Sequence, residues 1–395
     1  MKVLYTTGYA GTGKSTDLLE LLLTLSEDTS VCLAPTHKAL DRLRDATDSN
    51  IELKTIHSLL GWIPGINENA EHINHIDTVI KLDKEIDAYT DIVIDEAGMM
   101  SEDMLTTIIS RLEELHDFET DHITMHLFLD PYQLLPVKGI QIQTDPATTT
   151  NLTTQYRAES LDVVKLYTKF VNYLEGTNID DLTTPYSENV LEAKTIERFQ
   201  RGDRLLAYTN KCVGDYNKLI AQHLGITTFI GEEVQLGTQS DLFKVDDFVE
   251  PSLDDLVFLY ENNLLKMQNS QINKKFLLSS LKAMTMNENI KFIKSENRVI
   301  PVIIGIGDAY IVKQKAREAA INDKHYFRDV YALGRAFVMD YPFASTVHKS
   351  QGSEYDRVWI DKRDIQKSIF NNSYTNYARL MYVAISRAKR KIFIL

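Results

Sequence analysis

Cysteine is scarce in this chain of 395 residues, which contains only Cys32 and Cys212. Two cysteines that lie far apart in the sequence cannot build a disulfide framework or a cysteine-rich zinc site, so both are excluded. The N-terminus has one lysine before a glycine-rich segment and lacks the pattern of a secretory signal peptide. We therefore expect a reduced, cytoplasmic setting, which for a viral protein would be the host cytoplasm.

Long apolar runs and an excess of basic charge are also missing. No run approaches the ~20 residues of a membrane-spanning helix, and the longest, residues 299–306, is expected to be a buried strand. The chain has 43 Lys+Arg against 56 Asp+Glu, a net charge of −13. That balance argues against a protein that coats duplex nucleic acid non-specifically. With 44% hydrophobic and 25% charged residues the composition is globular, and the length suggests two to three domains.

What is present begins with alternating strands and helices, which indicates an α/β fold with a parallel sheet. The first domain is expected over residues 1–150, with a small insert at 62–90. Within that insert, Trp62 is either a wedge or a packing residue, and His72 and His75 belong to a solvated loop. The expected strands are 2–6, 31–34, 91–94 and 123–129, and the expected helices are 14–25 and 36–44.

A second α/β domain is expected over residues 151–225 and 343–395, interrupted by an accessory domain. The accessory domain, residues 226–342, has short β-rich runs such as 299–306 and 309–312 and is expected to contain a small antiparallel sheet. In the second domain the pattern predicts helices at 160–174, 210–224, after 344 and at 377–387, and strands at 204–208, 357–360 and 391–395.

The segment Gly8-Tyr-Ala-Gly-Thr-Gly-Lys14-Ser15 fits the pattern of a phosphate-binding loop, G-x-x-x-x-G-K-[ST]. It follows an expected strand and opens an expected helix, which is the context that this motif requires. Glycines let backbone N–H groups approach a phosphate, and the helix N-terminus attracts negative charge. Lys14 would reach the β- and γ-phosphates, while the Ser15 hydroxyl would sit on Mg²⁺.

Four further candidate residues follow two other expected strands or lie in two later segments of the chain. Asp95 and Glu96 end the apolar run 92–94, in the position of an acid that holds Mg²⁺ and a base that activates water. Gln133 follows another strand and could sense the γ-phosphate. Arg157 and Arg387 could neutralise charge that develops on the phosphate, although for either arginine alone a surface ion pair is the commoner role.

In chain order the segments are GYAGTGKS (8–15), LAPTHKA (33–39), TIHSLLG (55–61), IVIDEAGMM (92–100), LDPYQLLPV (129–137), LTTQYR (152–157), YTNKCVGDYN (208–217), STVHKSQGSEYDRV (345–358) and YVAISRAK (382–389). This series resembles superfamily 1 helicases, and most closely the RecD-like branch that includes the small phage helicase Dda. The resemblance covers roughly residues 1–60, 90–225 and 343–395. It implies two RecA-like motor domains that close on Mg·ATP at an interdomain cleft and move along single-stranded DNA.

The resemblance also implies roles for individual residues. Glu96, Gln133, Arg157 and Arg387 match catalytic positions, and Ser15 and Asp95 match the Mg²⁺ site. The matching nucleotide-binding positions are Gly8, Gly11, Thr12, Gly13, Lys14, Ser15, Thr16, Gly352 and Glu354. The positions in segments that line the single-strand track are Pro35, Thr36, His37, Thr55, His57, Asn210, Thr346, His348 and Lys349.

The form His-x-x-Gln-Gly at His348–Gly352 resembles the branch that moves 5′ to 3′. The implied partners are single-stranded and forked duplex DNA, with replication or recombination proteins, for a monomeric enzyme. Two alternatives stay open: a viral RNA helicase or NTPase, and a nucleotide-gated clamp that does not unwind. One departure concerns the adenine base. The resemblance implies an upstream helix with a base-reading Gln, and with the phosphate-loop strand expected from residue 2 we do not expect that helix here. Tyr9 and the aromatic residues of the second domain are possible stacking groups.

Overall fold

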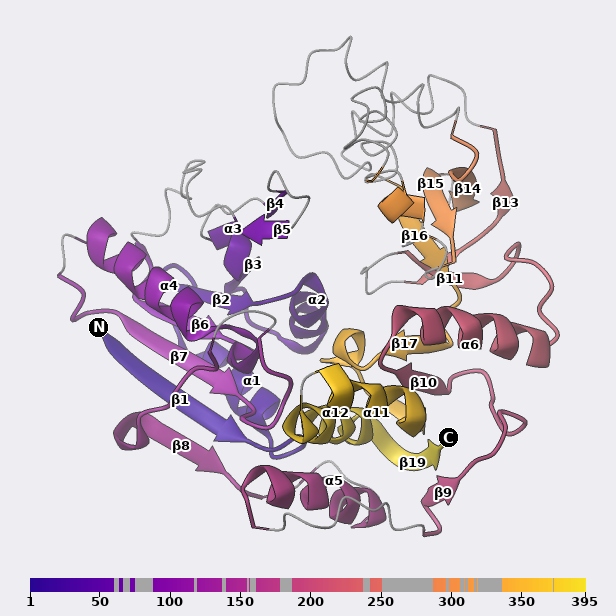
Figure 1. The fold of residues 1–395 in the computed structure, drawn as a ribbon. Coiled ribbons are helices and arrows are strands. Elements are labelled where there is room, and N and C mark those ends of the chain that lie inside the picture. Colours follow the sequence, from indigo (N-terminus) through magenta and orange to yellow (C-terminus); the bar gives the residue numbers. More distant parts are fainter. Residues whose placement is uncertain are drawn as a thin grey trace. The chain divides into compact units, whose positions relative to one another are not determined.

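The computed structural model describes residues 1–59, 64–66, 72–74, 88–116, 119–136, 140–154, 156, 161–177, 187–236, 242–250, 287–295, 298–305, 309, 312–315, 318, 336–371 and 373–395. The fold is α/β, as predicted, with helices that connect many of the strands of its sheets (Figure 1). The chain forms two compact units. The first comprises Met1–Glu192, Ser350–Arg357 and Gln366–Phe393, and the second Ala193–Lys349, Val358–Ile365 and Ile394–Leu395.

A six-stranded parallel sheet forms the centre of the first unit. Its order is β3-β2-β6-β7-β1-β8, so that strands distant in the sequence become neighbours. The strands are β1 (Lys2–Gly8), β2 (Ser30–Ala34), β3 (Glu52–Thr55), β6 (Asp91–Ile94), β7 (Thr124–Leu129) and β8 (Thr149–Leu152). The connecting helices include α1 (Lys14–Thr24), α2 (His37–Ala46), the short α3 (Ile56–Leu59) and α4 (Glu102–Leu115).

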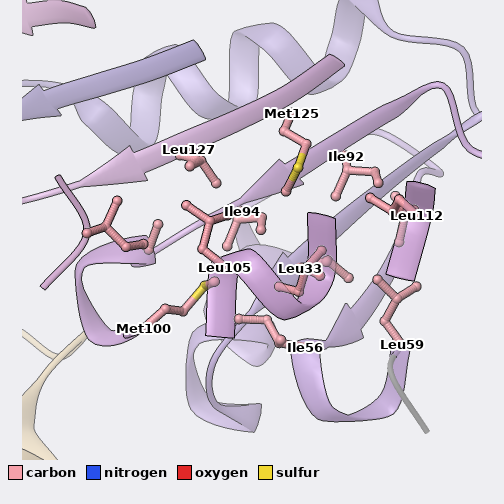
Figure 2. Packing of buried hydrophobic residues seen from close by; sticks show 14 of the residues in the cluster. Leu33, Ile56, Leu59, Ile92, Ile94, Met100, Leu105, Leu112, Met125 and Leu127 are labelled. Atoms are coloured by element: carbon pink, nitrogen blue, oxygen red, sulfur yellow. The ribbon is translucent and has the colours of Figure 1, made fainter. Parts of the chain in front are cut away.

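The two faces of this sheet bury alternate residues of the same strand, because successive side chains of a strand point to opposite sides. On β6, Ile92 and Ile94 pack in one cluster with Leu105 and Leu112 of α4, as Figure 2 shows. The intervening Val93 packs in another cluster with residues of α1. Helices therefore cover both faces, which accounts for the continuous apolar run of this buried strand.

A second sheet has the order β17-β10-β18-β19-β9, and β10 pairs in parallel with both of its neighbours. Its strands are β9 (Val190–Glu192), β10 (Arg204–Ala207), β17 (Ala344–Thr346), β18 (Tyr355–Ile360) and β19 (Ala388–Ile394). The helices in these segments are α5 (Leu161–Leu174), α6 (Asn210–His223), α11 (Lys362–Asn371) and α12 (Tyr374–Ser386).

The residues between α6 and β17 contribute a third sheet, of order β12-β11-β16-β15-β14-β13. It is mixed, since β15 and β16 pair in parallel while the other pairs are antiparallel. Its strands are β11 (Glu233–Leu236), β12 (Leu242–Lys244), β13 (Asp247–Phe248), β14 (Lys291–Ser295), β15 (Arg298–Ile304) and β16 (Phe337–Asp340). Inside residues 62–90, β4 (Pro64–Ile66) and β5 (His72–Asn74) form an antiparallel pair.

Three local expectations are wrong. His72, which was expected in a loop, lies in the short strand β5, where it pairs opposite Ile66 of β4. The helix expected after residue 344 is instead the short strand β17 followed by a 3-10 turn at His348–Ser350, because Ala344–Thr346 extend the sheet beside β10. The β run expected at 309–312 is helical at residues 309 and 312–315, where good helix formers such as Lys313 and Gln314 follow. Within the described part of the chain, no helix has the length and apolar character needed to cross a bilayer.

Candidate functional site

The loop between β1 and α1 has the backbone that a phosphate-binding loop requires. Gly11 and Gly13 have φ of 84° and 94°, in the left-handed region that favours glycine. At Gly8 a Cβ atom would lie 2.3 Å from Thr12 Oγ1 and 2.9 Å from the carbonyl oxygen of Leu152, so only glycine fits. The Thr12 hydroxyl donates a hydrogen bond to the Tyr9 carbonyl and closes the loop at 2.9 Å.

A pocket of about 180 Å³ lies against this loop, and all its lining residues belong to the first unit. The lining residues are Ala10, Gly11, Gly13, Lys14, Ser15, Thr16, Arg42, Glu96, Gln133, Tyr156 and Arg387. They include three cationic side chains and one carboxylate. The Lys14 ammonium group folds over the loop, where it donates to the carbonyls of Gly8 and Tyr9 at 2.7 Å each. The charge and the loop amides together suit an anionic ligand such as a nucleotide phosphate.

Asp95 and Glu96 lie at the carboxyl end of β6, next to the pocket. The Asp95 carboxylate is buried and accepts hydrogen bonds from the Glu96 N–H at 2.9 Å and from Arg42 at 3.0 Å. Burial, reinforced by the neighbouring Glu96 charge, raises the pKa of Asp95 to about 6, and Arg42 opposes that rise. The site therefore holds two adjacent carboxylates beside one guanidinium group.

Glu96 has a left-handed backbone, with φ of 52°, which is uncommon for a residue other than glycine. A conformation of this kind typically costs on the order of 1–3 kcal/mol and persists where the surrounding structure fixes it. Here the hydrogen bond from its own N–H to Asp95 fixes the turn. The turn places the Glu96 side chain on the pocket wall, whereas Asp95 does not line the pocket.

Gln133 reaches the same pocket from the loop that follows β7. Its side chain is 6% exposed, and its backbone carbonyl accepts a hydrogen bond of 2.6 Å from Arg379 of α12. Arg379 also donates to the Pro131 carbonyl at 2.7 Å. The guanidinium group of Arg379 therefore holds the backbone of the loop that carries Gln133.

Arg387 lies at the end of α12 and is 3% exposed. Its guanidinium group donates to the Val383 carbonyl at 3.2 Å, to the Ser386 hydroxyl at 3.0 Å and to the Ser353 carbonyl at 3.3 Å. These bonds orient a buried cation on the pocket wall, far in sequence from the phosphate loop. The other predicted arginine, Arg157, lies outside the described residues, as do Trp62 and His75.

Three residues of this site were not predicted from the sequence: Arg42, Tyr156 and Arg379. Arg42 comes from α2, and its closeness to Asp95 depends on β2 and β6 being adjacent in the sheet, which no local pattern signals. Tyr156 is the neighbour of Arg157 in the LTTQYR segment, so its position in that motif could have predicted that it belongs to the site. Its N–H donates to the Gly11 carbonyl at 2.9 Å, and its ring, 75% exposed, lies against Gly13.

Four other predicted nucleotide-site residues, Gly8, Thr12, Gly352 and Glu354, do not line the pocket. Thr12 is buried and Gly8 is packed against Leu152, so both support the loop. Gly352 has a left-handed φ of 72°, and Glu354 is 3.8 Å from Lys389 in an ion pair. Burial lowers the pKa of the Arg42 guanidinium group, but the carboxylates of Asp95, Glu96 and, to a smaller extent, Glu354 outweigh it and raise that pKa.

In the first unit, the predicted nucleic-acid residues follow β2 and β3. These strands pair in parallel with Ala34 opposite Thr55, so the segments after them begin side by side. Thr36 caps α2 by accepting from the Ala39 N–H, and the Thr55 hydroxyl accepts from the Ser58 N–H. His57 is partly exposed, and Pro35 stands between β2 and α2. The side chain of His37 lies outside the described residues.

In the second unit, the corresponding residues follow β10 and β17, which pair with Ala207 opposite Thr346. Asn210 is exposed at the start of α6, and His348 and Lys349 are exposed in the turn after β17. The rings of His348 and Tyr208 have centroids 6.2 Å apart. Thr346 is buried, and its hydroxyl accepts from the Lys349 N–H at 3.3 Å. In each unit, therefore, these residues gather at the carboxyl ends of two neighbouring strands at one edge of a sheet.

Mg²⁺ suits two oxygen donors of this site, the Ser15 hydroxyl in the pocket and the Asp95 carboxylate beside it. The described residues contain no group of three or more histidine, cysteine, aspartate or glutamate side chains that could enclose a metal. A Ser15 hydroxyl and an Asp95 carboxylate leave most of the coordination sphere to phosphate oxygens and water, and Mg²⁺ characteristically binds in this way. These two residues would hold the ion.

Comparison with known proteins gives matches at both ends of the chain. Residues 1–138 match the AAA domain family, and residues 341–395 match the UvrD-like helicase C-terminal domain family. Uncharacterized protein R530 of Acanthamoeba polyphaga mimivirus is 22% identical over an alignment that covers 99% of this chain and 94% of that protein. The two family matches support a superfamily 1 helicase, a class that hydrolyses nucleotides and acts on nucleic acid.

Solved structures of Pif1 helicases share the fold. A structure of two coordinating Pif1 helicases at forked duplex DNA aligns with a TM-score of 0.50 and 17% identity, over 100% of this chain and 87% of that one. Bacteroides Pif1 bound to single-stranded DNA aligns with a TM-score of 0.50 and 16% identity, over 100% of this chain and 88% of that one. At such identities the likeness concerns the fold, which agrees with the predicted RecA-like α/β architecture.

Proposed function

We propose that this chain is an ATP-dependent DNA helicase that moves 5′ to 3′ along single-stranded DNA and couples Mg·ATP hydrolysis to the unwinding of forked duplexes. One observation carries the proposal. A single pocket gathers Lys14, Glu96, Gln133 and Arg387 from four segments that lie far apart in the sequence. An ordinary glycine-rich turn gives no reason for a carboxylate, an amide and a buried arginine to meet at one helix N-terminus.

Each of these side chains has a role in hydrolysis that follows from its chemistry. Lys14 and the loop amides bind the phosphates, and Glu96 accepts a proton from the attacking water. Gln133 orients that water or the γ-phosphate. Arg387 stabilises the negative charge that develops during transfer. When bound, Mg²⁺ would neutralise charge on the β- and γ-phosphates.

The proposed DNA track uses the residues after β2 and β3 in the first unit and after β10 and β17 in the second. The predicted track residues include hydroxyl groups, histidines and Lys349, and Tyr208 is an aromatic neighbour of His348. Such a track binds a single strand by stacking and a few phosphate contacts. With a net charge of −13, we propose a modest and salt-sensitive affinity. The 5′-to-3′ direction rests on the resemblance of His348–Gly352 to the RecD-like branch.

The first experiment compares ATPase rates without nucleic acid, with single-stranded DNA and with single-stranded RNA. It is combined with unwinding of duplexes that carry either a 5′ or a 3′ tail. The proposal expects stimulation by DNA and opening of the 5′-tailed substrate. Stronger stimulation by RNA would favour the RNA helicase alternative, and ATPase activity without unwinding would favour the clamp. Opening of only the 3′-tailed substrate would refute the direction.

The second experiment removes the ammonium group at the phosphate loop. Lys14→Ala should abolish ATP hydrolysis while the protein keeps its circular dichroism spectrum and melting temperature. Lys165→Ala, which removes an exposed lysine from α5, is the matched control and should leave the rate unchanged. Normal turnover in Lys14→Ala would refute the proposal.

Sedimentation during unwinding tests the further proposal that the active enzyme is a monomer.

A further inference from the structure

One tyrosine links three parts of the candidate site through its hydroxyl group. Tyr382 of α12 is fully buried. Its hydroxyl accepts a hydrogen bond of 2.8 Å from the N–H of Ala10 in the phosphate loop, and donates one of 2.6 Å to Oδ2 of Asp130. All three residues belong to the first compact unit. We infer that Tyr382 is a positioning residue for nucleotide binding, which holds the phosphate loop in its binding conformation; this inference rests on the proposed function.

The direction of the two hydrogen bonds follows from the chemistry of the groups. A backbone N–H can only donate, so the Tyr382 oxygen must accept from Ala10, and its single proton is left for Asp130. Burial, followed by the nearby Asp130 carboxylate, raises the pKa of Tyr382, and the hydroxyl therefore stays protonated. The phenol group has one donor and one acceptor bond, and both partners are fixed.

Asp130 anchors the other end of this relay. It follows β7, is 1% exposed, and also accepts the N–H of Tyr132 at 2.9 Å. Burial raises the pKa of Asp130, while the Lys14 ammonium group and the Tyr382 hydroxyl both lower it. The ionised form of the Asp130 carboxylate is therefore stabilised both by the hydrogen bond from Tyr382 and by the positive charge of Lys14, the lysine that would bind phosphate.

The hydrogen bond from Ala10 matters because it fixes the orientation of one peptide group inside the loop. The peptide groups of a phosphate loop must point their N–H groups toward the anion in a set pattern. A loop free to rotate the peptide at Ala10 would spend part of its time in conformations that cannot bind. The apparent dissociation constant then rises in inverse proportion to the fraction that can bind.

Aromatic contacts hold the tyrosine ring in place independently of its hydroxyl. The ring packs edge-on against Tyr132, with centroids 6.2 Å apart, and against Tyr167 of α5 at 5.9 Å. Tyr132 in turn stacks on Tyr9 of the phosphate loop at 5.3 Å. Substitution by phenylalanine keeps these ring contacts and removes only the two hydrogen bonds, which makes Tyr382→Phe a specific test.

The same helix supplies a matched control. Tyr377 of α12 is buried, and its ring packs against Phe170, but its hydroxyl has no hydrogen-bond partner among the described residues. Tyr377→Phe removes a buried hydroxyl from α12 without touching the phosphate loop. Any effect of Tyr382→Phe beyond that of Tyr377→Phe therefore belongs to the bonds with Ala10 and Asp130.

The experiment measures the binding of a fluorescent ATP analogue carrying an N-methylanthraniloyl group, together with kcat and KM for ATP. For Tyr382→Phe we expect the dissociation constant and KM to rise about tenfold, the scale of a hydrogen bond to a charged group, while kcat stays within about threefold. Tyr377→Phe should match the wild type. Arg387→Ala should show the opposite pattern, with a lower kcat and a nearly unchanged dissociation constant.

Two further measurements separate positioning from a general loss of stability. Amide hydrogen exchange should become faster in the phosphate-loop peptide of Tyr382→Phe and stay unchanged in peptides of the second unit. In a double-mutant cycle, Asp130→Asn combined with Tyr382→Phe should weaken binding no more than the worse single variant, because both break one relay. Additive effects, or exchange that rises equally throughout the protein, would overturn the inference.

The outcomes also distinguish this inference from the proposed function. If the wild type neither binds nor hydrolyses ATP, both are refuted. If the wild type does both and Tyr382→Phe binds the analogue as tightly as the wild type, only the positioning role is refuted.

Discussion

The guanidinium group of Arg42 lies 3.0 Å from Oδ2 of Asp95 and 3.9 Å from Oε1 of the adjacent Glu96. Two neighbouring carboxylates beside a buried strand end repel each other, and a cation between them reduces that cost. Arg42 therefore makes it possible for both carboxylates to stand at the edge of the phosphate pocket. This arrangement places the proposed metal ligand and the proposed base within reach of one positive charge.

Burial of Asp95 should make stability depend on pH. Its folded-state pKa of about 6 lies above its ordinary value of 3.8, so between about pH 4 and 6 the folded protein binds more protons at Asp95 than the unfolded chain. Stability contributed by this group is thus present at low pH and is lost as the pH rises through 6. Asp95→Asn cannot ionise, so its stability relative to the wild type should increase by on the order of 2 kcal/mol from pH 4 to 7.

Thermal melts in EDTA at a series of pH values measure this difference. Asp28→Asn removes an exposed carboxylate and serves as the control, which should show no comparable trend. A difference between Asp95→Asn and wild type that stays constant with pH, or falls as the pH rises, would contradict the prediction.

Glu96 should be required for hydrolysis but not for nucleotide binding. Glu96→Gln keeps the shape of the side chain and removes its ability to accept a proton, so kcat should fall by about 100-fold or more. The dissociation constant for the fluorescent ATP analogue should change by less than about threefold, because Lys14 and the loop amides remain. Stopped-flow ATPase and equilibrium titration measure the two quantities. A variant that hydrolyses ATP at the wild-type rate would remove Glu96 from the mechanism.

Tyr156 should contribute to nucleotide affinity through its ring. The ring is exposed and lies against Gly13, beside the start of α1, where it can stack on the base of a nucleotide held by the loop. Tyr156→Ala should weaken ATP binding about fivefold, the lower end of typical stacking energies, and Tyr156→Phe should bind as the wild type does. GTP binding should weaken in parallel, since stacking tolerates any base. Equal binding by Tyr156→Ala and Tyr156→Phe would show that the ring does not contribute.

Lys349 should contribute one phosphate contact to the DNA track. Lys349→Ala should weaken binding to a single-stranded oligonucleotide and reduce the slope of log K against log salt by about 0.7, the value for one contact on a single strand. Fluorescence anisotropy at several salt concentrations provides both numbers. Lys165→Ala on α5 controls for the loss of one positive charge. An unchanged slope in Lys349→Ala would exclude this lysine from the track.

Much of the first sheet and its site follows from local pattern. The strand at Asp91–Ile94 and the helix that begins at Lys14 lie where the sequence predicts them, because an apolar run and a glycine-rich helix start are signals within a few residues. The short strand at Ala344–Thr346 was missed, because three residues hold an extended conformation only when a neighbouring strand pairs with them. The helix α11, at Lys362–Asn371, was also not predicted.

The sequence by itself identified the phosphate loop and the Asp95–Glu96 pair as candidate site residues, since each belongs to a short motif at the end of an expected strand. It identified Arg387 as a candidate through the resemblance to superfamily 1 helicases. Tertiary structure alone decided that Arg42 faces Asp95, that Arg379 holds the backbone at Gln133, and that Tyr382 joins the phosphate loop to Asp130. These partners come from elements that meet only through the order of strands and the packing of helices. Hydrogen bonds and ion pairs act over a few ångströms in space, and distance along the chain does not determine which groups come that close.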